Sequence, residues 1–106
     1  MALGMIEVYG FATAIVVADA MAKAADIRVA AIDKNKPAGG DSARVPLVMA
    51  IKIEGSAAAV ESAILAGKRE AEKRDLYITH KVIARQSEDI EWFVNLSALG
   101  KDALRG

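Results

Sequence analysis

Hydrophobic residues alternate with polar ones over four short stretches of the chain and recur at helical spacing over two longer ones. The alternation predicts strands at residues 3–9, 27–33, 45–54 and 76–83. The helical period predicts helices over residues 11–25 and from Ser56, a natural N-cap, to about Lys73. In the first helix we expect these apolar residues to face inward: Phe11, Ala14, Ile15, Ala18, Met21, Ala22 and Ala25. In the second helix the corresponding residues are Val60, Ala63, Ile64, Gly67 and Ala71.

The order strand–helix–strand, followed by the same order again, predicts an α+β fold. We expect a ferredoxin-like βαββαβ domain, with a four-stranded antiparallel sheet and both helices on one face. Residues 34–44 contain Pro37 and the pair Gly39-Gly40 and are predicted to be a loop. A short C-terminal helix is predicted from Ser87. We assign residues 1–95 to one domain and residues 96–106 to a C-terminal tail.

Composition narrows the possible functions. The 106 residues include 14 basic and 14 acidic side chains, so net charge gives no reason to expect a nucleic-acid partner. Aromatic residues make up only 5% of the chain, and we expect subunit interfaces to supply part of the stability. No uncharged apolar stretch approaches the length that spans a membrane, which favours a cytosolic protein without a membrane partner.

Candidate chemistry is sparse. The chain has no cysteine, which excludes disulfides and thiolate metal sites. His80 is the only histidine, and one imidazole without a second nitrogen or sulfur ligand makes a poor metal site. The segment Gly39-Gly40-Asp41 lacks the spacing of a Walker loop or a dinucleotide fingerprint and is interpreted as a turn. We therefore expect no catalytic residue, no metal and no cofactor.

Four segments, in this order, carry a resemblance to a known family. They are Ala2-Leu3-Gly4-Met5-Ile6-Glu7 with Gly10 and the Asp19-Ala20-Met21-Ala22-Lys23 run, the segment 53–60, the pair Ala66-Gly67, and Val82-Ile83-Ala84-Arg85. Together they resemble the hexagonal shell proteins of bacterial microcompartments. At Ala84 the chain departs from the family, which has proline there.

The resemblance implies a non-enzymatic structural protein in a cytoplasmic microcompartment. Six copies would form a homohexamer, hexamers would tile into a shell with other shell proteins, and small metabolites would pass a central pore. The resemblance places Lys23 and Arg85 at the edge between hexamers, with Asp19 and Ala22 nearby. Trp92 and Phe93 are interpreted as docking the C-terminal helix, or alternatively as part of a site for targeting helices of encapsulated enzymes.

The stretch between the second and third strands is longer than in ordinary family members. Its length and its Pro-Ala-Gly-Gly-Asp segment resemble the subgroup associated with glycyl-radical enzymes, but this chain lacks that subgroup's cysteine. An iron–sulfur cluster held by thiolates is therefore excluded at the pore. The residues expected to form the pore loop, and to set permeation or bind a ligand, are Lys36, Pro37, Ala38, Gly39, Gly40, Asp41, Ser42 and Arg44.

The residues themselves are also compatible with a second class of function. Ferredoxin-like domains of this length also serve as regulatory modules that bind small ligands at subunit interfaces, so the fold alone does not decide. A regulatory module predicts a saturable effector and a small closed oligomer. A shell protein predicts hexamers that continue to associate into sheets or tubes.

Overall fold

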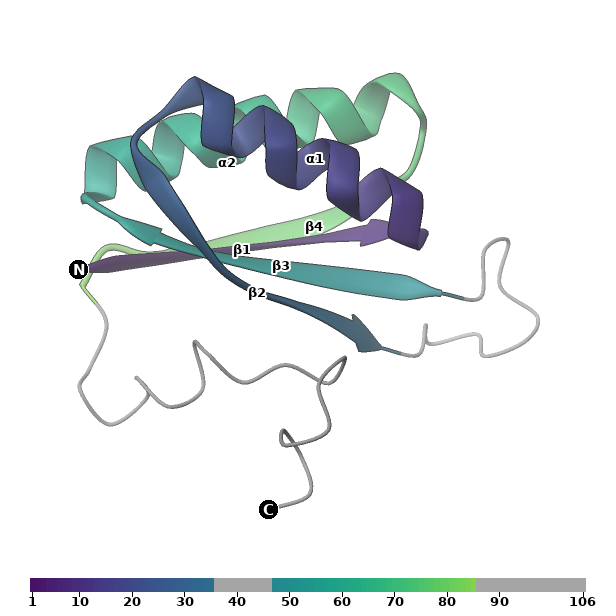
Figure 1. Cartoon of the computed structure of the whole chain (residues 1–106), viewed down its shortest axis with the longest axis horizontal. Helices are drawn as coiled ribbons and strands as arrows, with labels where there is room; N and C mark the ends of the chain where they lie inside the picture. Colours follow the sequence, from purple (N-terminus) through teal and green to yellow (C-terminus); the bar gives the residue numbers. More distant parts are fainter. Residues whose placement is uncertain (36–46, 86–106) are drawn as a thin grey trace, which may run out of the picture.

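The computed structural model describes residues 1–35 and 47–85. The elements follow in the order β1 (Ala2–Tyr9), α1 (Phe11–Ala24), β2 (Ile27–Asn35), β3 (Val48–Gly55), α2 (Ala57–Lys73) and β4 (Tyr77–Ile83) (Figure 1). The strands form one four-stranded sheet in the order β2-β3-β1-β4, and every neighbouring pair is antiparallel. The predicted ferredoxin-like arrangement is confirmed.

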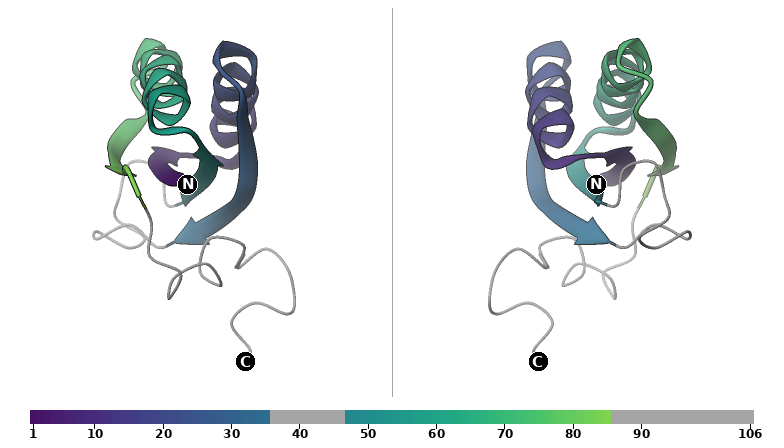
Figure 2. Two further views of the ribbon diagram at one scale, coloured as in Figure 1. Left: turned by 90° about the vertical axis from the view of Figure 1, so that its left-hand side faces the viewer. Right: turned by 90° about the vertical axis from the view of Figure 1, so that its right-hand side faces the viewer.

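Both helices cover one face of the sheet. α1 packs mainly against β2 and β3, whereas α2 packs mainly against β1 and β4. Figure 2 shows the consequence: α1 and β2 form one side of the domain, and α2 and β4 form the other. The helices also pack closely against each other at Gly67, where a Cβ atom would lie 2.8 Å from Cγ of Met21. Only glycine allows this approach without movement of Met21.

The core lies between the sheet and the helices. Residues two apart on a strand share a face, so Ile6 and Val8 of β1 join Ile51 and Ile53 of β3 beneath the helices. The inward residues predicted for α2 are all buried. Burial of these branched side chains supplies the main favourable free energy of the fold, about 25 cal/mol for each Å² of apolar surface removed from water.

The pairing register gives the domain two distinct ends. Tyr9 pairs with Val48, which also pairs with Asn35, and we call this the loop end because β2 stops and β3 starts here. Ala2 pairs with Gly55 at the other end, which we call the outer end. α1 begins at the loop end after Gly10, whose φ of +91° is open to glycine at little cost, and finishes at the outer end.

Some predicted boundaries were wrong by a few residues. β2 continues to Asn35 rather than Asp33, because Lys34 and Asn35 still pair with Met49 and Val48. Lys34 therefore belongs to the strand and not to the predicted loop. β4 begins at Tyr77 rather than Leu76, and α1 ends at Ala24.

The prediction for the buried face of α1 was wrong in part. Phe11 and Ile15 are 49% and 47% exposed, and Ala22 is exposed as well, whereas Thr13 and Val17 are buried. The reason is that α2 and the sheet cover only part of the apolar arc of α1. Val17 lies on the side that faces Gly67 of α2, and the other flank of the arc is left uncovered by the protomer.

Several predictions lie outside the described residues. The pore-loop candidates from Lys36 to Arg44, and the predicted start of the third strand at Val45, belong to residues 36–46. The predicted C-terminal helix with Trp92 and Phe93, and the tail at 96–106, belong to residues 86–106.

Candidate assembly surfaces

Three of the four edge candidates lie together near the C-terminal end of α1. Asp19, Ala22 and Lys23 are all exposed, and the helical spacing brings Nζ of Lys23 to 2.8 Å from Oδ2 of Asp19. The hydrogen bond to Asp19, together with its negative charge, raises the pKa of Lys23. The spacing of four residues between Asp19 and Lys23 in the sequence predicts this pair, and Lys23 presents its ammonium group to solvent at the outer end.

Arg85 lies two residues beyond the last residue of β4 and is exposed. β4 also finishes at the outer end, because Ile83 pairs with Leu3. β4 and β2 are the two edge strands of the sheet, and α1 packs on the β2 side. Among the described residues, two of the four edge candidates, Asp19 and Lys23, contact each other through an ion pair. Arg85 follows the edge strand on the other side of the domain.

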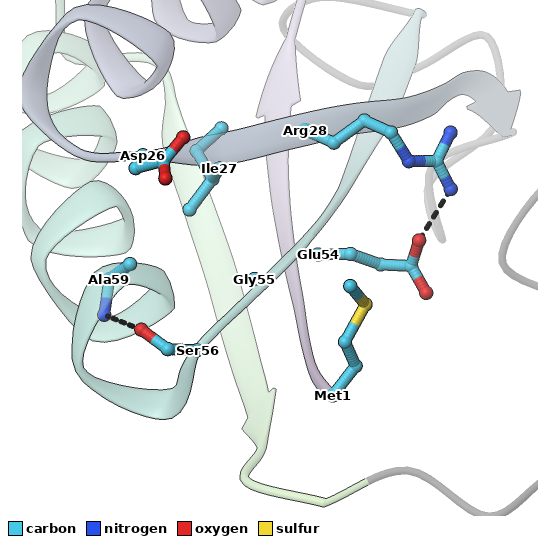
Figure 3. A pocket seen from close by; sticks show the side chains of 8 residues that line it. All are labelled: Met1, Asp26, Ile27, Arg28, Glu54, Gly55, Ser56 and Ala59. Atoms are coloured by element: carbon cyan, nitrogen blue, oxygen red, sulfur yellow. Dashed lines mark hydrogen bonds and ion pairs between the residues drawn. The ribbon is translucent and has the colours of Figure 1, made fainter.

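An open hollow of about 450 Å³ lies between the turns at the outer end (Figure 3). Its lining residues are Met1, Asp26, Ile27, Arg28, Glu54, Gly55, Ser56 and Ala59. The guanidinium of Arg28 on β2 pairs with the carboxylate of Glu54 on β3, and Oγ of Ser56 accepts a hydrogen bond of 3.1 Å from the backbone N–H of Ala59. These polar groups hold neighbouring strands and cap α2, so their chemistry here is structural.

The face of the sheet away from the helices carries a second ion pair between β2 and β3. Nζ of Lys52 lies 2.7 Å from Oδ2 of Asp33, and their side chains are only 2% and 17% exposed. Alternation along β3 places Lys52 on the face away from the helices, so its spacing in the sequence predicts a side chain in water. The sequence feature that could have indicated this ion pair is the opposite charge of Asp33, which lies diagonally across from Lys52 on β2.

A groove of about 480 Å³ runs between α2 and β4. It is lined by Glu61, Ile64, Leu65, His80, Lys81 and Val82. Leu65 is 55% exposed, which makes it the most exposed large apolar side chain among the described residues after Met1. No sequence pattern indicated this surface, because Leu65 is a single apolar residue outside the inward face of its helix.

His80 lies at the rim of this groove. Its Nδ1 is 2.7 Å from the hydroxyl of Tyr77, and the ammonium of Lys68 lies 5.4 Å from the centre of the Tyr77 ring. Within residues 1–35 and 47–85, no group of three or more His, Cys, Asp or Glu side chains is arranged to hold a metal ion. In the same residues, no helix is both long enough and apolar enough to cross a membrane.

Comparison with known proteins identifies the domain. The family described as the BMC domain matches residues 2–86, which is most of the chain and nearly all of the described part. The chain belongs to the BMC-domain family. This confirms the family predicted from the four sequence segments.

Two curated proteins with sequences similar to this chain are shell proteins. The microcompartment shell protein PduK of Citrobacter freundii is 42% identical over 88 residues, covering 83% of this chain and 51% of PduK. The carboxysome shell protein CsoS1A of Hydrogenovibrio crunogenus is 34% identical over 91 residues, covering 85% of each chain. The chain thus spans about half the length of PduK and most of CsoS1A.

A solved structure agrees with the fold. A microcompartment protein from Desulfitobacterium hafniense DCB superposes with a TM-score of 0.70 at 28% identity, covering 86% of this chain and 47% of that chain. The two curated relatives are named as shell proteins. The BMC domain described here is therefore a shell-protein domain, and a structural role in a bacterial microcompartment is supported.

Proposed function

We propose that this chain is a non-catalytic shell subunit that forms homohexamers, which tile with other shell proteins of the same compartment. The observation that carries this proposal is the separation of the two ends of the domain. β2 stops and β3 starts at the loop end, whereas Asp19, Lys23 and Arg85 belong to the outer end. With six loop ends around one axis, the ends of β2 and the starts of β3 would surround the centre, and the edge candidates would form the rim.

The rim has the chemistry that a flat contact between hexamers requires. Lys23 pairs with Asp19 and stays charged because its pKa is raised, and the guanidinium of Arg85 offers several donors in a rigid plane. Such donors can bridge backbone carbonyl groups on a neighbouring hexamer. Ala22 beside them is small enough to let two helices approach.

The connection between β2 and β3 is proposed to be the pore loop. It resembles the enlarged loop of the glycyl-radical-enzyme-associated subgroup, but without cysteine it cannot hold an iron–sulfur cluster through thiolates. Six copies of Lys36, Asp41 and Arg44 would give a ring of mixed charge around the axis. Selection of small charged metabolites by such a ring follows the same physics as other pores.

The oligomeric state tests this proposal most directly. We expect light scattering to give the mass of a hexamer, and negative-stain electron microscopy to show sheets or tubes. A monomer, dimer or trimer would contradict the shell role. Saturable binding of a small effector by such an oligomer would favour the regulatory module instead.

The rim is tested by Lys23→Ala and Arg85→Ala. We expect both variants to remain hexamers but to lose extended sheets, because the donors across the edge are removed. Lys73→Ala is the matched control, since Lys73 is 68% exposed, is ion-paired on a helix and belongs to the last turn of α2 at the loop end. Tiling by the Lys23 and Arg85 variants at the wild-type concentration would exclude the proposed edge role.

A further inference from the structure

His80 is the one side chain of this protein whose charge ordinarily changes between about pH 5 and 8, because the chain has a single histidine and no cysteine. It lies within β4, an edge strand, and pairs with Ile6 of β1. Residues paired across two strands share a face of the sheet, and Ile6 is buried beneath the helices. His80 therefore lies on the helix side, where it lines the groove between α2 and β4.

Tyr77 can pair with His80 in either protonation state. Its hydroxyl oxygen lies 2.7 Å from Nδ1 of His80. When the neutral ring carries its proton on Nε2, the hydroxyl donates to Nδ1, whereas the imidazolium donates from Nδ1 to the hydroxyl oxygen. The Tyr77 side chain also packs against the core. Protonation therefore changes the charge of the groove but keeps this contact within the protomer.

The charges around His80 do not balance an added cation. Among the described residues, α2 brings the carboxylate of Glu61 to the groove and the ammonium of Lys68 to 5.4 Å from the centre of the Tyr77 ring. β4 brings the ammonium of Lys81, and the residue that faces His80 from β1 is apolar. An imidazolium would thus join two ammonium groups and one carboxylate. The chain has no net charge while His80 is neutral, so its protonation makes every copy a cation.

We propose that protonation of His80 weakens the association of this chain with its ring neighbours, so that hexamers form near neutral pH and dissociate in mild acid. The inference rests on the proposed hexamer and concerns its regulation. With the loop end at the axis and the outer end at the rim, ring neighbours face the side formed by α1 and β2 and the side formed by α2 and β4 (Figure 2).

The sign of the effect follows from desolvation. A neighbour on the side of α2 and β4 removes water from the groove, and a desolvated imidazolium beside two ammonium groups costs free energy that a neutral imidazole does not. The assembled ring therefore favours neutral His80, and its stability is lost as the pH falls and the imidazole takes up its proton. Since Tyr77 can pair with both forms, the fold of the protomer should be far less sensitive to pH than the assembly.

Light scattering over a range of protein concentrations, at about pH 7.5 and about pH 5.5 on either side of the usual histidine titration, tests the proposal. For the wild type, the concentration needed for half assembly should rise about 5-fold or more at the lower pH, the lower end of typical coupling between linked equilibria. His80→Gln keeps a polar group for Tyr77 but cannot gain a proton, so it should assemble alike at both pH values. His80→Lys carries a permanent charge and should need the higher concentration at both.

A histidine outside the groove is the matched control. Arg69 is exposed on α2 and does not line the groove. Arg69→His in the His80→Gln background restores one histidine at the wrong place, so assembly should remain insensitive to pH. Thermal unfolding of every variant should match the wild type, because both substituted side chains are exposed.

The outcomes separate the pH effect from the shell role. Wild-type hexamers that persist equally at both pH values would overturn the role of His80 and leave the shell role intact. The same holds for a His80→Gln variant that dissociates in acid as the wild type does, since carboxylates would then be responsible. A wild type that is monomeric at the higher pH would instead overturn the shell role itself.

Discussion

Two ion pairs of the same chemistry stand in contrasting environments. Lys52 and Asp33 join β2 to β3 with side chains 2% and 17% exposed, whereas Lys23 and Asp19 on α1 are 75% and 60% exposed. Their N–O distances are nearly equal, at 2.7 and 2.8 Å. The two pairs differ in solvent exposure, and the free energy lost when one partner is removed differs with it. The buried pair therefore serves the fold of the protomer, while the exposed pair is available for assembly.

The largest effect is expected at the buried pair. Lys52→Ala removes the ammonium from a pair whose side chains are 2% and 17% exposed, and breaking a buried pair by removing one partner typically costs about 3–5 kcal/mol of unfolding free energy. Urea unfolding followed by circular dichroism measures this loss. A change below about 1 kcal/mol, the usual value for an exposed pair, would show that Lys52 is effectively solvated.

Removing both charges should be far milder than removing one. The double variant Lys52→Met, Asp33→Leu replaces the pair by apolar side chains of similar size, and such replacements are often neutral or stabilising. We expect it to recover more than half of the stability lost in Lys52→Ala. Recovery of less than this would mean that further contacts of Lys52 or Asp33, and not the pairing itself, hold β2 to β3.

The exposed pair should behave in the opposite way. Lys23→Ala is expected to shift the urea midpoint by an amount comparable to the spread between repeat measurements, because water screens this charge. The same variant should lose extended sheets in electron microscopy. A large drop in stability together with unchanged tiling would reverse the roles assigned to the two pairs.

Among the ion pairs, the smallest effect is expected from pH. The pKa of Lys23 is raised in the folded protein by Asp19, so the stabilisation from this pair is complete below the unfolded pKa and is lost as pH rises through the folded one. Glu70 has the opposite sign: the hydrogen bond from Arg74 lowers its pKa, so its contribution is present above the unfolded pKa and fades as pH falls through the folded one. Titration followed by NMR at the two side chains checks both directions, and added salt should shrink both shifts. A salt-insensitive shift would indicate a buried pair.

Local patterns determined much of this protein. Alternation along the strands and the helical period of α2 predicted four strands, two helices and the inward residues of α2, because each of these depends on the spacing of apolar residues within one element. The pairing of Asp19 with Lys23 could also be predicted from the sequence, because residues four apart on a helix are neighbours. The four short segments named the family.

Tertiary structure alone decided how far each apolar arc is covered. Phe11 and Ile15 have the helical spacing of core residues, yet α2 and the sheet reach only the other flank of α1, so they are exposed. Lys52 has the spacing of a solvent-facing residue, yet it is buried against Asp33 from another strand. Burial depends on what neighbouring elements place against a side chain, and that information is distributed over parts of the chain that no local pattern connects.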